Sequence, residues 1–202
     1  MQAEKLWYFV GLIASDGCLS NDQRHIDITA KEKKFLELLK QDLNLNCGIG
    51  QKTNGRGQIA YRLQFSCVSI YAFLKKCGLS PNKSKTLADL DIPDDHFSHF
   101  LRGVLDGDGC IRKWKSNKFK FVNRYVKITS GSEKFLIWIN KKIHRLFNAS
   151  GTIHLEQYKK SSAYILKISR KSHYQKVLRI CYQNDWLALP RKRVQALEAL
   201  YG

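Results

Sequence analysis

Hydrophobic and polar residues along the first half of the chain follow two spacings. A continuous apolar stretch over residues 6–14 predicts a helix buried on most sides, and alternation in residues 25–29 and 61–65 predicts two strands. Helical spacing returns in residues 31–43 and 69–78. Both halves have the same coarse pattern, which we interpret as helix, strand, strand, helix, strand, strand, helix.

The apolar positions of these elements predict which faces are buried. The predicted helical stripes are Phe35, Leu38, Leu39 and Leu43 in the first amphipathic helix and Ile70, Phe73, Leu74 and Cys77 in the second. In the last strand of each half, the apolar faces are Tyr61, Leu63 and Phe65, and Tyr164, Leu166 and Ile168. Successive strand residues point to opposite faces. The positions expected to face away from the core, where a partner would lie, are therefore Arg62, Gln64, Ile165 and Lys167.

The chain repeats itself in three ordered places. Residues 8–20 (YFVGLIASDGCLS) correspond to residues 100–112 (FLRGVLDGDGCIR), and two further pairs follow in the same order, namely 25–39 with 125–139 and 60–74 with 163–177. Such self-similarity indicates duplication with loop insertions. The acidic segment 88–96, which contains Pro93, is the expected connection between the halves. We therefore predict an N-terminal repeat over residues 1–90, a linker over 91–97 and a C-terminal repeat over 98–202.

Charge narrows the class of partner. The chain of 202 residues has 35 Lys and Arg against 17 Asp and Glu, a formal net charge of +18. A compact body with this much self-repulsion is best matched to a polyanion, so nucleic acid is the leading partner. A membrane surface is disfavoured because no basic amphipathic helix stands out, and no apolar stretch is long enough to span a bilayer. The protein is expected to be intracellular, in a cytoplasm or an organelle, and not secreted.

The cysteines do not predict a metal or disulfide framework. Six are present, widely spaced and without a CxxC pair, so we interpret them as reduced thiols in the core.

Two nine-residue segments inside the repeat carry a recognisable motif. FVGLIASDG (residues 9–17) and LRGVLDGDG (residues 101–109) resemble the LAGLIDADG signature of the homing endonucleases. The resemblance covers nearly the whole chain and implies an α+β fold of two pseudo-symmetric αββαββα repeats packed through their motif helices. In that fold, two antiparallel sheets form a saddle over duplex DNA. The resemblance also implies a single-chain monomer that needs no protein partner.

Physical arguments support the resemblance. Gly11 and Gly103 lie inside predicted helices, where glycine costs about 1 kcal/mol relative to alanine, a cost that close approach of two backbones would explain. Asp16 and Asp108 end these helices, and the glycines that follow them fit left-handed C-terminal caps. Carboxylates at paired helix ends could share the divalent cations that phosphodiester cleavage needs. An isolated Asp-Gly pair is usually an ordinary helix stop, but its recurrence in matching contexts favours a site.

The resemblance implies specific ligands and a cofactor. Asp16 and Asp108 would be the catalytic metal ligands, with Ser15 and Gly107 beside them in the metal site. The cofactor would be two or three Mg²⁺ ions, with Mn²⁺ or Ca²⁺ able to substitute for binding. A calcium-binding EF-hand is disfavoured because Asn117 stands where the loop would need an acid.

The two motif copies differ from each other. Ala14 and Ser15 stand before Asp16, whereas Asp106 keeps the earlier acid of the signature in the second copy. The two active sites are therefore expected to be related but unequal. Arg102 occupies a motif position that is usually small, and its direction is left open.

Basic clusters close each half. By spacing, Lys83 and Arg191 match the family's basic residues near the scissile phosphate, with Lys85, Lys192 and Arg193 as competitors. Plain phosphate contact at a solvated helix start is an equal alternative. Thr29 and Ser130 resemble the family's polar residues that hold active-site water.

The strands are expected to read DNA in the major groove, where antiparallel ribbons fit. The predicted DNA-binding residues are Lys52, Arg56, Arg62 and Gln64 in the first half and Lys113, Lys115, Lys127 and Lys167 in the second. Because the halves differ at outward positions, the target would be only pseudo-palindromic.

The sequence therefore predicts a site-specific endonuclease that makes a double-strand break with 3′ overhangs. An RNA maturase and a non-cleaving DNA-binding regulator of the same fold are the alternatives. An unrelated nuclease or RNA-binding protein would require the repeat to be accidental.

Overall fold

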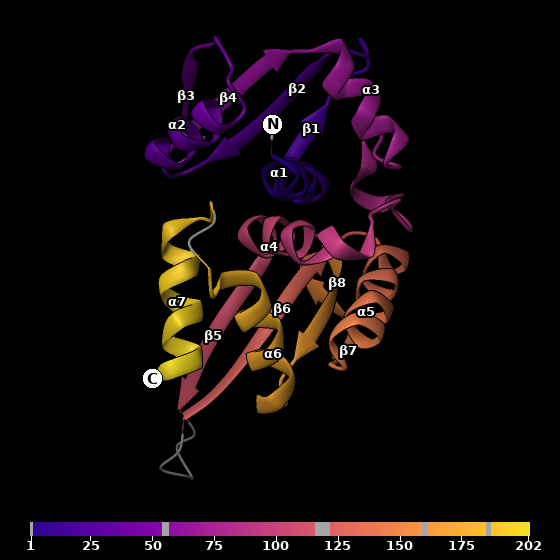
Figure 1. The fold of residues 1–202 in the computed structure, drawn as a ribbon, viewed down its shortest axis with the longest axis vertical. Coiled ribbons are helices and arrows are strands. Elements are labelled where there is room, and N and C mark those ends of the chain that lie inside the picture. Colours follow the sequence, from indigo (N-terminus) through magenta and orange to yellow (C-terminus); the bar gives the residue numbers. More distant parts are fainter. Residues whose placement is uncertain (1, 54–56, 116–121, 159–160, 185–186) are drawn as a thin grey trace.

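The computed structural model describes residues 2–53, 57–115, 122–158, 161–184 and 187–202. Its elements follow the predicted order twice, with one more helix at the C-terminal end (Figure 1). The first half contains α1 (Ala3–Ser15), β1 (Gly17–Leu19), β2 (His25–Ala30), α2 (Lys33–Asp42), β3 (Ile49–Thr53), β4 (Ile59–Ser66) and α3 (Val68–Lys76). The second contains α4 (Phe97–Gly107), β5 (Gly109–Lys115), β6 (Val122–Ser130), α5 (Glu133–Phe147), β7 (Thr152–Tyr158), β8 (Ser161–Ile168), α6 (Lys171–Tyr182) and α7 (Pro190–Tyr201).

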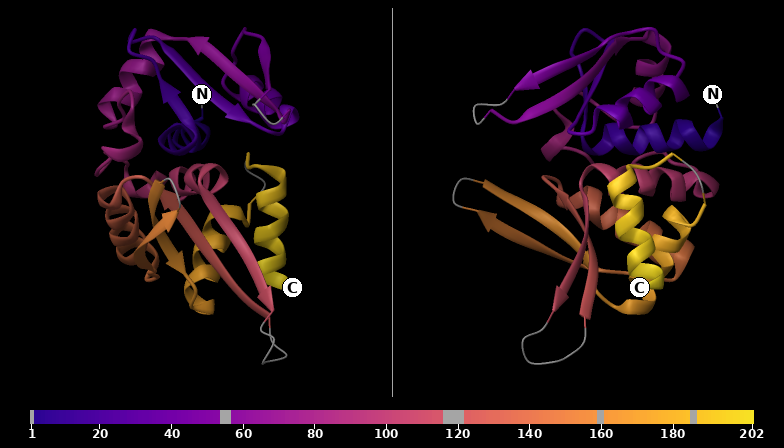
Figure 2. Two further views of the ribbon diagram at one scale, coloured as in Figure 1. Left: turned by 180° about the vertical axis from the view of Figure 1, so that it is seen from behind. Right: turned by 90° about the vertical axis from the view of Figure 1, so that its left-hand side faces the viewer.

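Each half builds one antiparallel four-stranded sheet. The strand orders are β1-β2-β4-β3 and β5-β6-β8-β7, so the two sheets have the same topology. Both sheets extend to one side of the α1 and α4 pair, with the helices gathered on the other side (Figure 2, right). The predicted fold class is confirmed.

Helices α1 and α4 lie side by side between the two sheets (Figure 1). A Cβ added at Gly11 would lie 2.1 Å from the Phe100 carbonyl oxygen, and one added at Gly103 would lie 2.2 Å from the Tyr8 carbonyl oxygen. No side chain fits at either position, which confirms that these glycines allow the two backbones to touch.

The glycines after the aspartates have a different role from the predicted one. Gly17 and Gly109 begin β1 and β5, and neither has a positive φ. Asp16 is itself the C-cap of α1, in right-handed helical conformation. A Cβ at Gly17 would lie 2.6 Å from the Ile13 Cα, and one at Gly109 would lie 2.4 Å from the Leu105 carbonyl oxygen. The prediction of left-handed caps is wrong, because the glycines instead let each strand fold back closely on its helix.

Burial follows most of the predicted stripes. Leu63 and Phe65 of β4 and Leu166 and Ile168 of β8 are buried, as predicted. On α2, Phe35, Leu39 and Leu43 are buried as predicted. Leu38 is 37% exposed, however, and Leu36 is fully buried in its place as α2 packs on β4.

The segment between the halves is held against α5. Lys142 donates to the Ile92 carbonyl oxygen at 2.9 Å and to Asp94 at 2.6 Å, and Arg145 donates to the same carboxylate at 2.6 Å. Ile92 and Phe97 are buried. The connection therefore contributes to the core, and the division into residues 1–90, 91–97 and 98–202 stays a prediction.

Two further expectations concern the whole chain. All six cysteines are free. Cys77 and Cys181 are buried in the core and Cys47 and Cys67 pack against it, whereas Cys18 is exposed, so the prediction of a core thiol is wrong for Cys18. Within the described ranges, no helix is both long and apolar enough to cross a membrane.

Replacing Gly103 with alanine should test the close contact between the helices. The added Cβ would collide with the backbone of α1, so we expect Gly103→Ala to lower the free energy of unfolding by about 2 kcal/mol or more. Chemical denaturation measures the change. Gly48→Ala is the control, because a Cβ there meets nothing within 4 Å. We expect it to change stability by less than about 0.5 kcal/mol. Equal stability of the two variants would contradict the contact.

Candidate active site

The ends of α1 and α4 bring two carboxylates together. Asp16 and Asp108 directly follow the last residues of these helices, at the ends from which β1 and β5 begin. A Cβ at Gly107 would lie 3.3 Å from Asp16 Oδ2 and 2.1 Å from Ser15 Oγ. The end of α4 thus packs directly on the end of α1, and a larger residue at position 107 would push the two aspartates apart.

The electrostatics of the two aspartates are coupled. Burial, and the nearby Asp16 carboxylate, raise the pKa of Asp108 to about 6. Asp16 is open to solvent on one side, but removal of water by the surrounding helix ends still raises its pKa. Lys192 and Lys83 oppose the shift at both aspartates. The two carboxylates are therefore close to each other and are partly compensated by two neighbouring lysines.

Two buried lysines occupy equivalent places beside the aspartates. Lys83 Nζ donates to the Gly17 carbonyl oxygen at 2.5 Å, and Lys192 Nζ donates to the Gly109 carbonyl oxygen. Both lysines are less than 10% exposed, and burial lowers the pKa of each. Each ammonium thus contacts the residue that follows an aspartate in its own half.

Arg191, the sequence-based match to Lys83, lies elsewhere. Its Nε donates to Glu32 at 2.7 Å on the protein surface. Its positive charge still acts to lower the pKa of Asp16. Position 192 points toward Gly109 because it lies one residue further around the first turn of α7. Lys85 is exposed and Arg193 is half-buried, and Lys192 is the geometric counterpart of Lys83.

The donor set at the helix ends fits a hard divalent cation. Burial first, and then the neighbouring Asp16 carboxylate, disfavours the charged form of Asp108, and a cation between the two carboxylates would offset both effects. Magnesium is commonly held by one or two carboxylates together with water and substrate phosphates. In the described part of the chain, no group of three or more His, Cys, Asp or Glu side chains gathers around a possible ion site.

Ser15, predicted for the metal site, and Ser130, predicted to hold active-site water, are both already hydrogen-bonded. Ser15 Oγ donates to the Gly11 and Leu12 carbonyl oxygens at 3.0 and 3.2 Å. Ser130 Oγ accepts from the Ser132 backbone at 3.1 Å, whereas Thr29 lines a cavity of about 670 Å³ together with Asp16.

A buried polar cluster beside the site was not predicted. The Asp106 carboxylate, 2% exposed, accepts hydrogen bonds from Tyr8 Oη, Tyr182 Oη and the Leu189 backbone, each at 2.7 Å. Burial raises the pKa of Asp106 to about 6, while these donors and Arg102 act in the opposite direction. The only sequence signals were the acid at position 106 and the unexpected arginine at 102.

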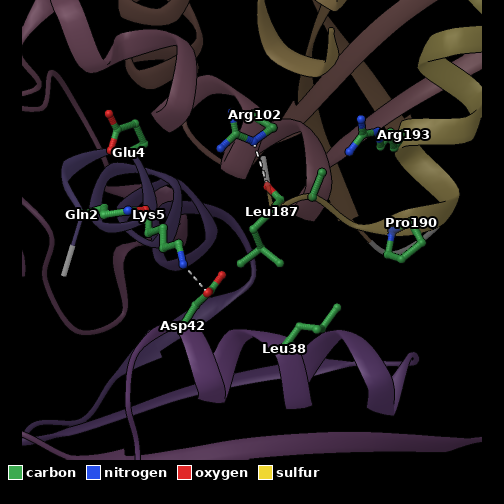
Figure 3. Close-up of a pocket in the computed structure, with 10 residues that line it drawn as sticks. Gln2, Glu4, Lys5, Leu38, Asp42, Arg102, Leu187, Pro190 and Arg193 are labelled. Carbon is green, nitrogen blue, oxygen red and sulfur yellow. Dashed lines mark hydrogen bonds and ion pairs between the residues drawn. The ribbon is translucent and has the colours of Figure 1, made fainter. Parts of the chain in front are cut away.

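Arg102 is the cationic member of this cluster. Its guanidinium lies 4.9 Å from the centre of the Tyr8 ring, and its Nε donates to the Leu187 carbonyl oxygen at 2.9 Å (Figure 3). It also lies 3.2 Å from His99 Nδ1. Arg102 is 1% exposed, so its charge is compensated inside the protein and not on the surface.

On the first sheet, the predicted DNA-binding residues share the open face. Strand register places Lys52, Arg62 and Gln64 opposite the buried Leu63 and Phe65. Arg62 is not extended into solvent, because its Nη2 contacts Asp27 Oδ2 at 2.5 Å and its buried Nε has no hydrogen-bond partner. Asp27, which sequence reasoning missed, therefore fixes the direction of this arginine.

On the second sheet, Lys127 and Lys167 are paired directly on the open face. Lys167 Nζ lies 4.6 Å from the centre of the Tyr125 ring, and Lys127 Nζ lies 3.9 Å from Glu156 Oε2. Ile165 has the same orientation, away from the core as predicted, but it is only 1% exposed and so does not offer a surface to a partner. It is covered because it lies on the central strand β8, flanked by Thr129 and His154.

By strand alternation, Lys113 lies on the other face of β5 from Arg112 and Trp114. It pairs with Arg124 and lines a cavity with Glu198 of α7, and it also borders the cavity lined by Lys127 and Lys167. Arg112 and the 56% exposed Trp114 take the open face instead. Arg56 and the side chain of Lys115 lie outside the described part of the structure.

Comparison with known proteins supports the motif in the first half. Residues 3–78 match the model of the LAGLIDADG-like domain. A comparison with curated protein sequences gives no match.

Solved structures with the same fold include DNA-bound nucleases. The chain resembles I-DmoI in complex with DNA and Ca, with a TM-score of 0.61, 18% identity and 97% of each chain covered. It resembles I-SmaMI, a LAGLIDADG homing endonuclease bound to cleaved DNA, with a TM-score of 0.64, 16% identity, and 96% of this chain and 87% of that chain covered.

A third similar structure is full-length DUF199/WhiA from Thermatoga maritima, with a TM-score of 0.62 and 14% identity. The match covers 97% of this chain but only 60% of the WhiA chain. Identities this low establish the fold alone. Because homing endonucleases and WhiA share it, the fold does not decide between cleavage and binding.

The buried His99 should make stability depend on pH. Burial, and the adjacent Arg102, lower the pKa of His99 to about 4, so it stays neutral in the folded protein while the unfolded chain takes up a proton near pH 6.5. Its contribution to stability is therefore present above pH 6.5 and is lost as the pH falls toward 4. We expect this loss to be about 2 kcal/mol smaller in His99→Gln than in the unchanged protein. Urea denaturation across this range measures it, and parallel pH profiles would refute it.

Proposed function

We propose that this protein is a LAGLIDADG homing endonuclease that binds a long duplex DNA site as a monomer and cuts both strands with the help of Mg²⁺. The observation that carries the proposal is the meeting of Asp16 and Asp108 at the touching ends of α1 and α4, with Lys83 and Lys192 beside them. The DNA-bound endonucleases of the same fold support it.

In this proposal, two aspartates bind the metal ion and two lysines supply positive charge beside it. Asp16 and Asp108 would hold the metal, which would supply an activated water and neutralise charge on the leaving oxygen. Lys83 and Lys192 each use one N–H on a glycine carbonyl and place positive charge where a phosphate would approach. Lys192, rather than Arg191, is the proposed counterpart of Lys83.

The open faces of the two sheets would contact the DNA. We propose residues 1–90 and 98–202 as two units that each read half of a pseudo-palindromic site. Phosphate contacts fix position, whereas contacts to base edges carry sequence information. Lys127 and Lys167 would contact phosphates. Gln64, and Arg62 oriented by Asp27, would contact base edges.

Removing both carboxylates should separate binding from cleavage. We expect Asp16→Asn with Asp108→Asn to retain duplex binding and to lower cleavage in Mg²⁺ by about a thousandfold or more, because the metal provides several kcal/mol of transition-state stabilisation. The target is first selected from a randomised DNA library, and cleavage and gel-shift assays then measure the change. Asp91→Asn with Asp95→Asn, two surface substitutions with the same total charge change, is the control. Full cleavage by the double variant would refute the assignment.

A competing outcome of the same assays is RNA binding without cleavage. Tighter binding to a structured intron RNA than to the selected duplex, with no cut ends in the library, would favour a maturase. No cleavage with tight duplex binding would favour a regulator.

Two lysines on opposite faces of the second sheet provide a matched test of the DNA surface. Lys127→Ala should reduce the slope of log binding constant against log salt by about 1, as expected for the loss of one phosphate contact. Lys113→Ala removes the same charge from the face toward α7 and should change the slope much less. Fluorescence anisotropy over a salt series measures both. Equal slopes for the two variants would place the DNA elsewhere.

A further inference from the structure

The Asp106 cluster joins elements from both halves of the chain. Asp106 lies on α4, and its hydrogen-bond donors lie on α1 (Tyr8), at the end of α6 (Tyr182) and at the start of α7 (Leu189). The carboxylate therefore binds both ends of the connection from α6 to α7. Arg102, one turn earlier on α4, binds the same connection through the Leu187 carbonyl oxygen, at the edge of the cavity in Figure 3.

The bond to Leu189 sets where α7 begins. Leu189 is the N-cap of this helix, and its carbonyl oxygen accepts from the Lys192 and Arg193 backbones at 2.9 and 3.1 Å. Pro190 at the first helical position restricts the backbone further. Negative charge near a helix start is also favourable. Holding Leu189 thus holds the first turn, on which Lys192 reaches back to the Gly109 carbonyl oxygen.

The first half holds its lysine differently. Ala14 is the counterpart of Asp106 on α1, so no carboxylate is present at that position. Lys83 lies in a short 3-10 helix, Lys83–Lys85, that follows Asn82 with φ of 55°. Its carbonyl oxygen accepts from the Thr86 and Leu87 backbones. Local backbone bonds therefore fix Lys83, whereas a bond across 83 residues of sequence fixes the start of the helix that carries Lys192.

We propose that Asp106 is a positioning residue for one of the two active sites: it anchors the start of α7 and so keeps Lys192 at Gly109, beside Asp108. This role rests on the proposed nuclease function. Asp106 acts through its hydrogen bonds. Loss of its carboxylate should therefore impair cleavage of one DNA strand more than cleavage of the other. Ala14 at the equivalent position of the first half then means that Lys83 is held in another way, and not that a catalytic group has been lost.

Strand-specific nicking by the full chain tests the proposal. Asp106→Ala should slow cleavage of one strand by about tenfold or more relative to the other, mainly through kcat, because a small displacement of a catalytic group is costly. The slowed strand should be the one slowed by Lys192→Met, and Lys83→Met should slow the other. Asp106→Asn should restore much of the rate, since its amide oxygen can still accept from Leu189.

Tyr8→Phe is the matched control, because it removes a bond to the same carboxylate oxygen and leaves the bond to Leu189. It should keep the strand ratio of the unchanged protein. Should Asp106→Ala fail to fold, Leu189→Pro breaks the same bond from the other side. The φ of −66° at Leu189 suits proline, and this variant should give the same strand bias.

Hydrogen–deuterium exchange gives a readout that does not need cleavage. Residues 187–193 should exchange faster in Asp106→Ala than in Tyr8→Phe. Equal slowing of both strands, or unchanged exchange in this segment, would overturn the positioning role. If the unchanged protein does not cut DNA, the proposed function is overturned, and the exchange result alone decides whether Asp106 anchors α7.

Discussion

The structure depends on one close contact, the approach of α1 and α4 at Gly11 and Gly103. A Cβ at either glycine would lie about 2 Å from a carbonyl oxygen of the other helix, so the two backbones touch without side chains between them. This contact brings the helix ends together and with them Asp16 and Asp108. The same contact sets the two sheets on one side of the molecule, because each helix leads directly into the first strand of its sheet. One steric requirement therefore determines both the carboxylate pair and the surface proposed for DNA.

Around this shared centre, the two halves reach similar geometry by different means. Each places a buried lysine on the carbonyl oxygen of the glycine after its aspartate. The N-terminal half does so with a short local turn, whereas the C-terminal half needs α7 and the Asp106 cluster that anchors it. Burying Asp106 and Arg102 is costly, and the hydrogen bonds and opposite charges within the cluster offset that cost. The two lysines therefore occupy equivalent positions although different contacts hold them there.

The sequence predicted the fold, the helix contact and the candidate aspartates because duplication made each weak signal appear twice. It did not predict the direction in which individual side chains point from a helix or a strand. Spacing alone could not tell that Lys192 points inward from the first turn of α7 while Arg191 points to Glu32. Nor could composition tell that Lys113 lies on the far face of β5, because a strand reverses its side chains at every residue. The Asp106 cluster was inaccessible for another reason, since its donors are 76 to 98 residues away in sequence.

The sheets also differ in length, and this difference bears on the shape of the recognised site. Strand β1 has three residues and its counterpart β5 has seven, so the outer hairpin of the second sheet is longer by four residues. At about 3.3 Å per residue this is roughly 13 Å, close to the rise of four base pairs. Under the proposed function, the protected stretch of DNA would therefore be off-centre. It would reach about four base pairs further from the cut on the C-terminal side than on the N-terminal side.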